Sequence, residues 1–115
     1  MIAVAAKNQN FDIVKSLVKS EADVDGKDEN GTTAIIYASK FNNYDAIQLL
    51  IKEDANIDIE NNEGHSALSY AVLNRNISII NLLIKNEVSY KLTKIAKLCN
   101  LPENSSLYIL LEENE

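Results

Sequence analysis

The sequence is poor in the residues that build covalent cross-links, loops and membrane anchors. It has one cysteine, Cys99, so it cannot form an internal disulfide, and its one proline and three glycines argue against a loop-rich or fibrous fold. No apolar run approaches the roughly 18 residues of a membrane span, and Met1 is not followed by the basic and then apolar segments of a secretory signal. We therefore expect an intracellular, cytoplasmic protein without a membrane span.

Positive charge is also scarce. The 115 residues contain 11 Lys and Arg against 17 Asp and Glu, for a formal net charge of −6, and the cations are scattered along the chain. Binding to nucleic acid or to an anionic membrane requires clustered Lys and Arg, so neither kind of surface is expected. The net charge instead favours a basic protein partner.

The side chains needed for catalysis or metal binding are equally few. His65 is the only histidine, and no nearby cysteine is available to share a metal or a proton with it. The sequence has no glycine-rich phosphate loop and no serine-centred nucleophile motif. We expect no catalytic residue, no metal, no cofactor and no enzymatic activity, with His65 an exposed loop residue and Cys99 buried on the apolar side of a helix.

What the sequence does contain is an internal repeat of 33 residues. Shifted by this period, the chain aligns with itself without gaps, and the same residues coincide in successive units. Such triplets are Ala5, Ala38 and Ala71; Leu17, Leu50 and Leu83; and Lys19, Lys52 and Lys85. A sustained period of this length is typical of a solenoid of stacked supersecondary units.

Each unit contains segments with helical patterning. The longer segment is amphipathic, with apolar residues at i, i+3, i+6 and i+7. The three apolar faces are Phe11, Val14, Leu17 and Val18; Tyr44, Ile47, Leu50 and Ile51; and Ile77, Ile80, Leu83 and Ile84. A shorter helix is predicted before two of them, over residues 34–40 and 67–73, and asparagine-rich turns at 42–43 and 74–76 join the two helices of a pair.

Between successive helix pairs the sequence predicts a hairpin or loop. Alternating apolar residues lead to turns at Gly31 and Gly64, where glycine tolerates a positive φ. A helix pair of this size cannot bury its apolar face alone, so neighbouring pairs must stack and share a core. We predict an all-α repeat solenoid that forms one domain over residues 1–115. Its parts are an opening unit without a hairpin at 1–27, units at 28–60 and 61–90, and a degenerate closing helix pair at 91–115 that caps the stack.

The repeat resembles the ankyrin motif, whose first half reads D-x-x-G-x-T-P-L-H-x-A-A. Residues 28–38, DENGTTAIIYA, align with that half, and residues 44–58, YDAIQLLIKEDANID, align with the second half. The resemblance covers about 90 residues and includes the register of the unit. The chain departs from the motif at Ile36 and Ser69, where the family usually has a histidine that ties loops together by hydrogen bonds.

Resemblance to this family implies a protein–protein interaction module that acts as an adaptor, scaffold or inhibitor. Its members grip partners on a concave surface of hairpin tips and short helices. Carried over by register, the partner-binding positions are Lys7, Asn8, Glu29, Asn30, Thr32, Lys40, Phe41, Asn62, Glu63, His65, Leu73 and Asn74. The alternative is a structural spacer, or a fragment of a larger ankyrin-repeat protein, without a ligand of its own. We expect the chain to be monomeric.

Phe41 and Leu73 are large apolar residues at positions where the helical pattern expects solvent. Two interpretations remain open for them. Either they anchor a protein-binding patch rimmed by Glu29, Lys40 and Glu63, or they fold over the helix turn and pack against a neighbouring unit.

Overall fold

The computed structural model describes residues 2–20 and 23–86, and these residues form six α-helices and no β-strand. The helices are α1 (Ile2–Lys7), α2 (Phe11–Lys19), α3 (Ala34–Lys40), α4 (Tyr44–Lys52), α5 (Ala67–Leu73) and α6 (Ile77–Lys85). The closing helix pair predicted at 91–115, and Cys99 with it, lie outside the described residues.

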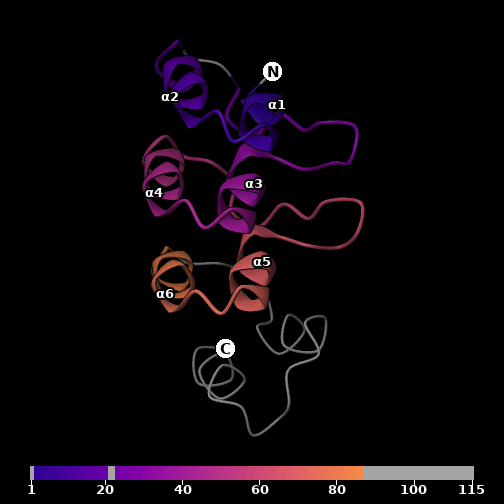
Figure 1. The fold of residues 1–115 in the computed structure, drawn as a ribbon, viewed down its shortest axis with the longest axis vertical. Helices are drawn as coiled ribbons and strands as arrows, with labels where there is room; N and C mark the ends of the chain where they lie inside the picture. The colour runs from indigo at the N-terminus through magenta and orange to yellow at the C-terminus, as the bar shows by residue number, and fades with distance from the viewer. Residues whose placement is uncertain (1, 21–22, 87–115) are drawn as a thin grey trace, which may run out of the picture.

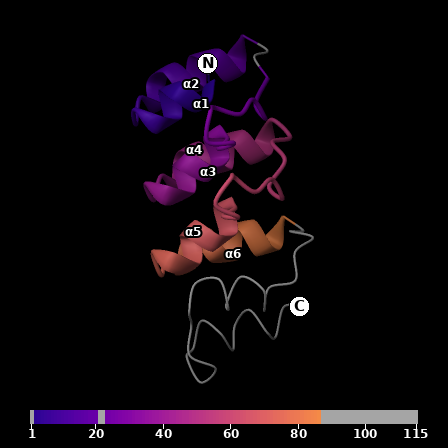
Figure 2. The same cartoon turned by 90° about the vertical axis from the view of Figure 1, so that its right-hand side faces the viewer.

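The helices are arranged in two parallel rows (Figure 1). The short helices α1, α3 and α5 make one row, the long helices α2, α4 and α6 make the other, and each helix pair stacks on the pair before it. Figure 2, turned by 90°, shows the pairs advancing along one axis. This arrangement confirms the all-α repeat solenoid predicted from the sequence.

Loops join the successive pairs. The loop before α3 and the loop before α5 extend to the same side of the stack, away from the long helices (Figure 1). Their tips hold Gly31 and Gly64, whose φ angles are +72° and +83°. Side chains with a Cβ adopt this conformation only at a cost in energy, so glycine is favoured at each tip.

Each long helix begins at an asparagine cap. Asn10, Asn43 and Asn76 occupy the same register position, and each side-chain oxygen accepts a hydrogen bond from the backbone N–H three residues further on, at 3.4, 3.0 and 3.2 Å. Such a cap satisfies a donor that the helix N-terminus leaves open and contributes about 1 kcal/mol. The residue before each cap turns the chain with a positive φ; these residues are Gln9, Asn42 and Arg75.

The core lies between the two rows and between successive pairs. Ala38 and Ala71 of the short helices are 0% exposed, and their small side chains allow the adjacent helices to approach closely. The long helices contribute Ile47, Leu50 and Leu83, which are also 0% exposed. Burying one such aliphatic side chain stabilises the fold by about 1.5–3 kcal/mol.

The predicted buried faces of α4 and α6 are wrong at one position each. Tyr44 and Ile77, the first residues of their helices, are 39% and 47% exposed. Ala46 and Ile79 are buried instead, on the side that meets the preceding long helix. The equivalent Ile13, with no described pair before it, is 47% exposed.

Candidate functional site

The two described loops share one hydrogen-bonded turn. In the first loop, the Asp28 side-chain oxygen Oδ1 accepts hydrogen bonds from the backbone N–H groups of Asn30 and Thr32, at 2.9 and 3.0 Å. In the second loop, Asn61 Oδ1 accepts from the N–H groups of Glu63 and His65, at 3.0 Å each. Because Asp28 and Asn61 are register equivalents, both tips have the same shape and present equivalent residues.

A tyrosine of the following short helix holds each turn. The Tyr37 hydroxyl donates a hydrogen bond to the Asp28 carboxylate, and in the next unit the Asn61 amide donates to the Tyr70 hydroxyl at 3.3 Å. Burial raises the pKa of the Asp28 carboxyl, but hydrogen bonds from Tyr37 and from backbone N–H groups outweigh it, so the net effect is a lowered pKa. Burial, followed by the bond to Asp28, raises the pKa of Tyr37.

The two loops are also bonded to each other. The backbone N–H of Asn62 donates to the Asn30 carbonyl at 2.9 Å, and the Asn62 side-chain amide donates to the Glu29 carbonyl at 3.3 Å. Further from the tips, the N–H of Asn56 donates to Asp25 Oδ1 at 2.7 Å. These bonds fix the spacing of the two tips, so the side chains on them are presented by a braced surface.

Side-chain contacts also join the ends of the short helices α3 and α5. The Asn74 amide donates to the carbonyls of Ser39 and Lys40, at 3.3 and 3.0 Å, and so ties the end of α5 to the end of α3. The Lys40 ammonium nitrogen lies 6.0 Å from the centroid of the Phe41 ring and 5.7 Å from that of Tyr70, within the range of cation–π attraction.

Most of the predicted partner-binding residues lie at the surface of these loops and helix ends. Eleven of the twelve are exposed or half-buried. Thr32 is the exception, with 4% of its surface exposed. Its N–H donates to Asp28 and its carbonyl accepts from the N–H of Asp28, so Thr32 closes the turn from inside and offers a partner almost no surface.

Phe41 and Leu73 have different surroundings. The Phe41 ring stacks on Tyr37, with 6.3 Å between centroids and 9° between planes, and packs against the buried core. Leu73 is 45% exposed. Phe41 therefore packs over the turn against Tyr37 of its own unit and the core, whereas Leu73 is an accessible apolar side chain.

His65 was predicted as an exposed loop residue, and that prediction is wrong. It is half-buried, with Nδ1 at 2.9 Å from the Ser69 hydroxyl and the ring stacked on Tyr70 at 4.8 Å between centroids. Ser69 also forms a capping box with Ser66 at the start of α5. In this unit a serine thus makes the loop-to-helix hydrogen bonds for which the resembled motif uses a histidine.

Charge is divided between the loops and the long helices. The loop at 23–32 carries four carboxylates and one lysine, and the loop at 56–65 carries three carboxylates and neither lysine nor arginine. Each long helix carries at least as many lysines as carboxylates. The loop side is consequently the acidic side of the described stack.

Neither a metal-holding cluster nor a membrane-spanning helix is found in the part of the chain that the structure describes. Within residues 2–20 and 23–86, no group of three or more His, Cys, Asp or Glu side chains is placed to hold a metal ion. None of the six helices is long and apolar enough to cross a bilayer.

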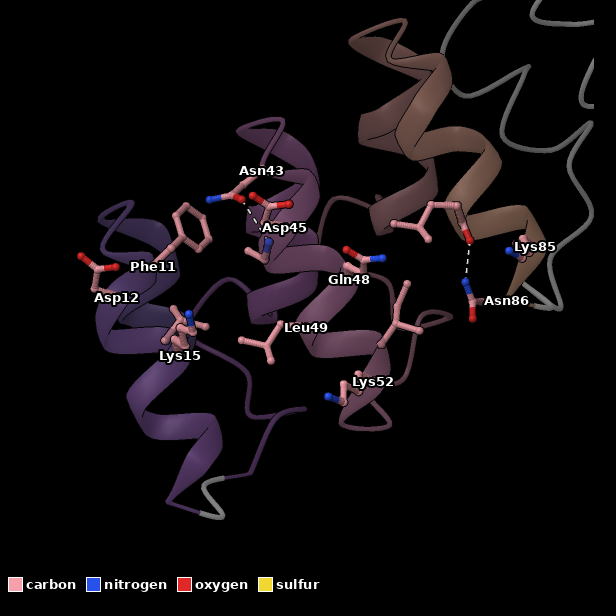
Figure 3. Close-up of a pocket in the computed structure, with 14 residues that line it drawn as sticks. Phe11, Asp12, Lys15, Asn43, Asp45, Gln48, Leu49, Lys52, Lys85 and Asn86 are labelled. Atoms are coloured by element: carbon pink, nitrogen blue, oxygen red, sulfur yellow. Dashed lines mark hydrogen bonds between the residues drawn. The ribbon is translucent and has the colours of Figure 1, made fainter.

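One surface feature was not predicted from the sequence. A groove of about 840 Å³ runs over the outer side of α2, α4 and α6 (Figure 3), on the side of the stack away from the loops. Its lining combines polar and apolar residues of three separate helices. Periodicity within a single helix does not reveal a hollow between helices, so the sequence carried no direct signal for it.

Comparison with protein-family models identifies the family of this repeat. A family model described as ankyrin repeats, in three copies, matches residues 1–94. The match covers most of the chain and all three described helix pairs. No curated protein matches the chain.

Proposed function

Because this chain belongs to the ankyrin-repeat family, we propose that it binds a partner protein through its loop and short-helix face, as an adaptor, scaffold or inhibitor. Ankyrin repeats are generally protein–protein interaction modules. The surface in question consists of the accessible candidates at the loop tips and short-helix ends. They are Lys7, Asn8, Glu29, Asn30, Lys40, Phe41, Asn62, Glu63, His65, Leu73 and Asn74. We further propose that the chain works as a monomer in the cytoplasm.

The observation that carries this proposal is the bracing of one face across successive units. Asn62 ties the second loop to the first, and Asn74 ties the end of α5 to the end of α3. Hydrogen bonds of this kind limit the motion of the surface before a partner arrives. A preorganised surface loses less conformational entropy on binding, so more of its contact energy appears as affinity.

The charge of this face supports a basic partner. Glu29 and Glu63 are exposed near the two tips, on loops that carry most of the negative charge of the described stack. A negative surface accelerates the encounter with a positive one and makes the association rate sensitive to salt. Exposed Leu73, the last residue of α5, supplies an apolar contact on the same face.

The proposal is tested by affinity purification with a matched variant. The native chain and a variant with Glu29, Glu63 and Leu73 changed to Ala are used as baits, and proteins lost from the variant are purified and titrated against both chains. Phe41 is left unchanged because it packs against the core. We expect the variant to bind its partner at least about tenfold more weakly. A purified partner that binds both chains equally would contradict the proposal, and capture of no specific partner would favour a structural spacer.

A further inference from the structure

The groove on the outer side of α2, α4 and α6 has an apolar floor in two sections. Phe11 and Leu49 lie in the first section, between α2 and α4 (Figure 3). Leu82 has in α6 the register position that Leu49 has in α4, so with Ile51 it forms the second section, between α4 and α6. Phe11, Ile51 and Leu82 pack against the buried core, whereas Leu49 is half-buried and not part of that packing.

The two sides of this floor carry opposite charges. Lys52 and Lys85, in the last turns of α4 and α6, line one side, and Asp12 and Asp45, in the first turns of α2 and α4, line the other (Figure 3). Lys15, in the middle of α2, also lines the groove. The members of each pair are register equivalents, 33 residues apart in the sequence. Each pair is therefore separated by one step of the stack, and so are the two floor sections.

The length of that step selects the shape of an occupant. Packed helices lie about 8–10 Å apart, so the two floor sections are separated by about that distance. In an α-helix, residues i and i+7 lie on the same face and are about 10.5 Å apart along the axis. In an extended chain, same-face residues recur about every 6.6 Å and fall at about 6.6 or 13 Å. A helix lying across α2, α4 and α6 matches the step, and an extended strand does not.

We propose that this outer groove binds an amphipathic α-helix of a partner protein, with apolar residues seven apart in the two floor sections, acidic residues facing Lys52 and Lys85, and basic residues facing Asp12 and Asp45. The proposal is independent of the loop and short-helix face, which lies on the other side of the stack. It describes a helix-in-groove contact in which charge on both flanks sets the alignment.

The probe is a synthetic helix of roughly 18 residues, long enough to cross three helices. It carries Leu at i, i+3, i+7 and onward, Glu on one flank and Lys on the other. A control peptide has the same composition, with its leucines distributed around the helix. We expect the probe, measured by fluorescence anisotropy, to bind the native chain at least about tenfold more tightly than the control peptide does.

Two independent protein variants test the floor and the flank. Leu49→Ser gives α4 the residue that α2 has at this register position, Ser16, and leaves the buried core unchanged. Lys52→Glu with Lys85→Glu makes both flanks acidic. Each variant is expected to weaken probe binding by about tenfold or more, and a second probe with Lys on both flanks should bind the Lys52→Glu, Lys85→Glu chain more tightly than the first probe does.

Matched controls lie on the other face. Leu73→Ser removes an exposed leucine, and Lys7→Glu with Lys40→Glu reverses two exposed lysines that are also one register step apart. These chains should bind the probe as the native chain does, with unchanged helical circular dichroism in all variants. Chemical-shift changes on adding the probe should fall on α2, α4 and α6.

Several results would overturn the proposal. They are equal binding of the probe and control peptides, unchanged affinity in both groove variants, and chemical-shift changes confined to the loops at 23–32 and 56–65. A concentration-dependent dimer that Leu49→Ser abolishes would also overturn it, because a second copy of the chain would then be the occupant.

Discussion

The Tyr37 hydroxyl donates a hydrogen bond to the Asp28 carboxylate, which joins the tip of the first loop to the middle of α3. The same carboxylate accepts from two backbone N–H groups of the loop, so one side chain fixes both the shape of the turn and its position on the helix. One unit later, the uncharged Asn61 accepts the equivalent backbone bonds and donates its amide N–H to the Tyr70 hydroxyl. This substitution within the repeat supplies a natural reference for the role of the charge.

Asp28→Asn is expected to make the free energy of unfolding less dependent on pH in the acid range. The pKa of Asp28 is lowered in the fold from its ordinary value of 3.8, so its stabilising contribution is complete above that value and is lost as the pH falls below it and through the lower pKa of the folded state. Replacement by Asn should cost about 1 kcal/mol at pH 7, because a hydrogen bond to a charged acceptor becomes a neutral one. Urea unfolding at pH 7 and across pH 5 to 2 tests this. Glu29→Gln, which removes an exposed charge beside it, should keep the native pH profile; equal profiles for native and Asp28→Asn chains would contradict the assignment.

The N-cap residues of α3 and α5 should differ in their contribution to stability. The Ser66 hydroxyl accepts from the N–H of Ser69, so Ser66→Ala should cost about 1 kcal/mol. The hydroxyl of Thr33, at the same register position, is buried without a hydrogen-bond partner. Thr33→Val should therefore leave stability unchanged or raise it by about 1 kcal/mol. Thermal melting of both variants tests this. A large loss of stability in Thr33→Val would show that the Thr33 hydroxyl has a hydrogen-bond partner in the fold.

Two adjacent leucines of α4 should differ sharply in their contribution to stability. Leu50 is 0% exposed in the core, whereas Leu49 is half-buried and lines the outer groove. Leu50→Ala should lower the free energy of unfolding by about 2–5 kcal/mol through the cavity it leaves. Leu49→Ala should lower it by less than about 1 kcal/mol. If the two variants lost similar free energy of unfolding in urea, the face of α4 that contains Leu50 would not be the buried one.

The two tip glycines should not tolerate alanine equally. Both have a positive φ, which costs a residue with a Cβ about 1–2 kcal/mol. At Gly31 a Cβ would also lie 2.6 Å from Asn62 Oδ1, whereas at Gly64 it would meet nothing within 4 Å. Gly31→Ala should therefore cost about 1 kcal/mol more than Gly64→Ala, because the Asn62 side chain must move and lose its bond to Glu29. Combining Gly31→Ala with Asn62→Ala should remove the difference between the two glycines; a difference that persists would place its origin elsewhere.

The repeat made most of the fold predictable from sequence. A fixed period places every helix by its equivalents in other units, so the bounds of α3 and α5 agree with the residues predicted, and the tips at Gly31 and Gly64 have the expected φ. What periodicity within one helix did not predict is which side meets the preceding pair. Ile79 is buried and Ile77 exposed for that reason, because stacking depends on a neighbour outside the segment.

Less of the candidate binding face than of the fold could be predicted from the sequence. Register placed its residues at the loop tips and helix ends, but it could not separate a side chain that faces solvent from one that closes a turn. Thr32 is buried and His65 is engaged with Ser69 and Tyr70, and both contacts depend on loop geometry. The sequence also contains a signal for the caps of the long helices. Asparagine recurs at positions 10, 43 and 76, and this period marks the caps of the long helices.

The most direct test of the proposed function is the affinity of a purified partner for two charge-reversed chains. One carries Glu29→Lys with Glu63→Lys at the loop tips, and the other carries Asp12→Lys with Asp45→Lys on the long helices; each adds the same charge at exposed sites. Binding through an acidic loop and short-helix face predicts a loss of about tenfold or more for the first chain, mainly in the association rate at low salt, and little change for the second. Equal losses in both chains, or a loss only in the second, would contradict it.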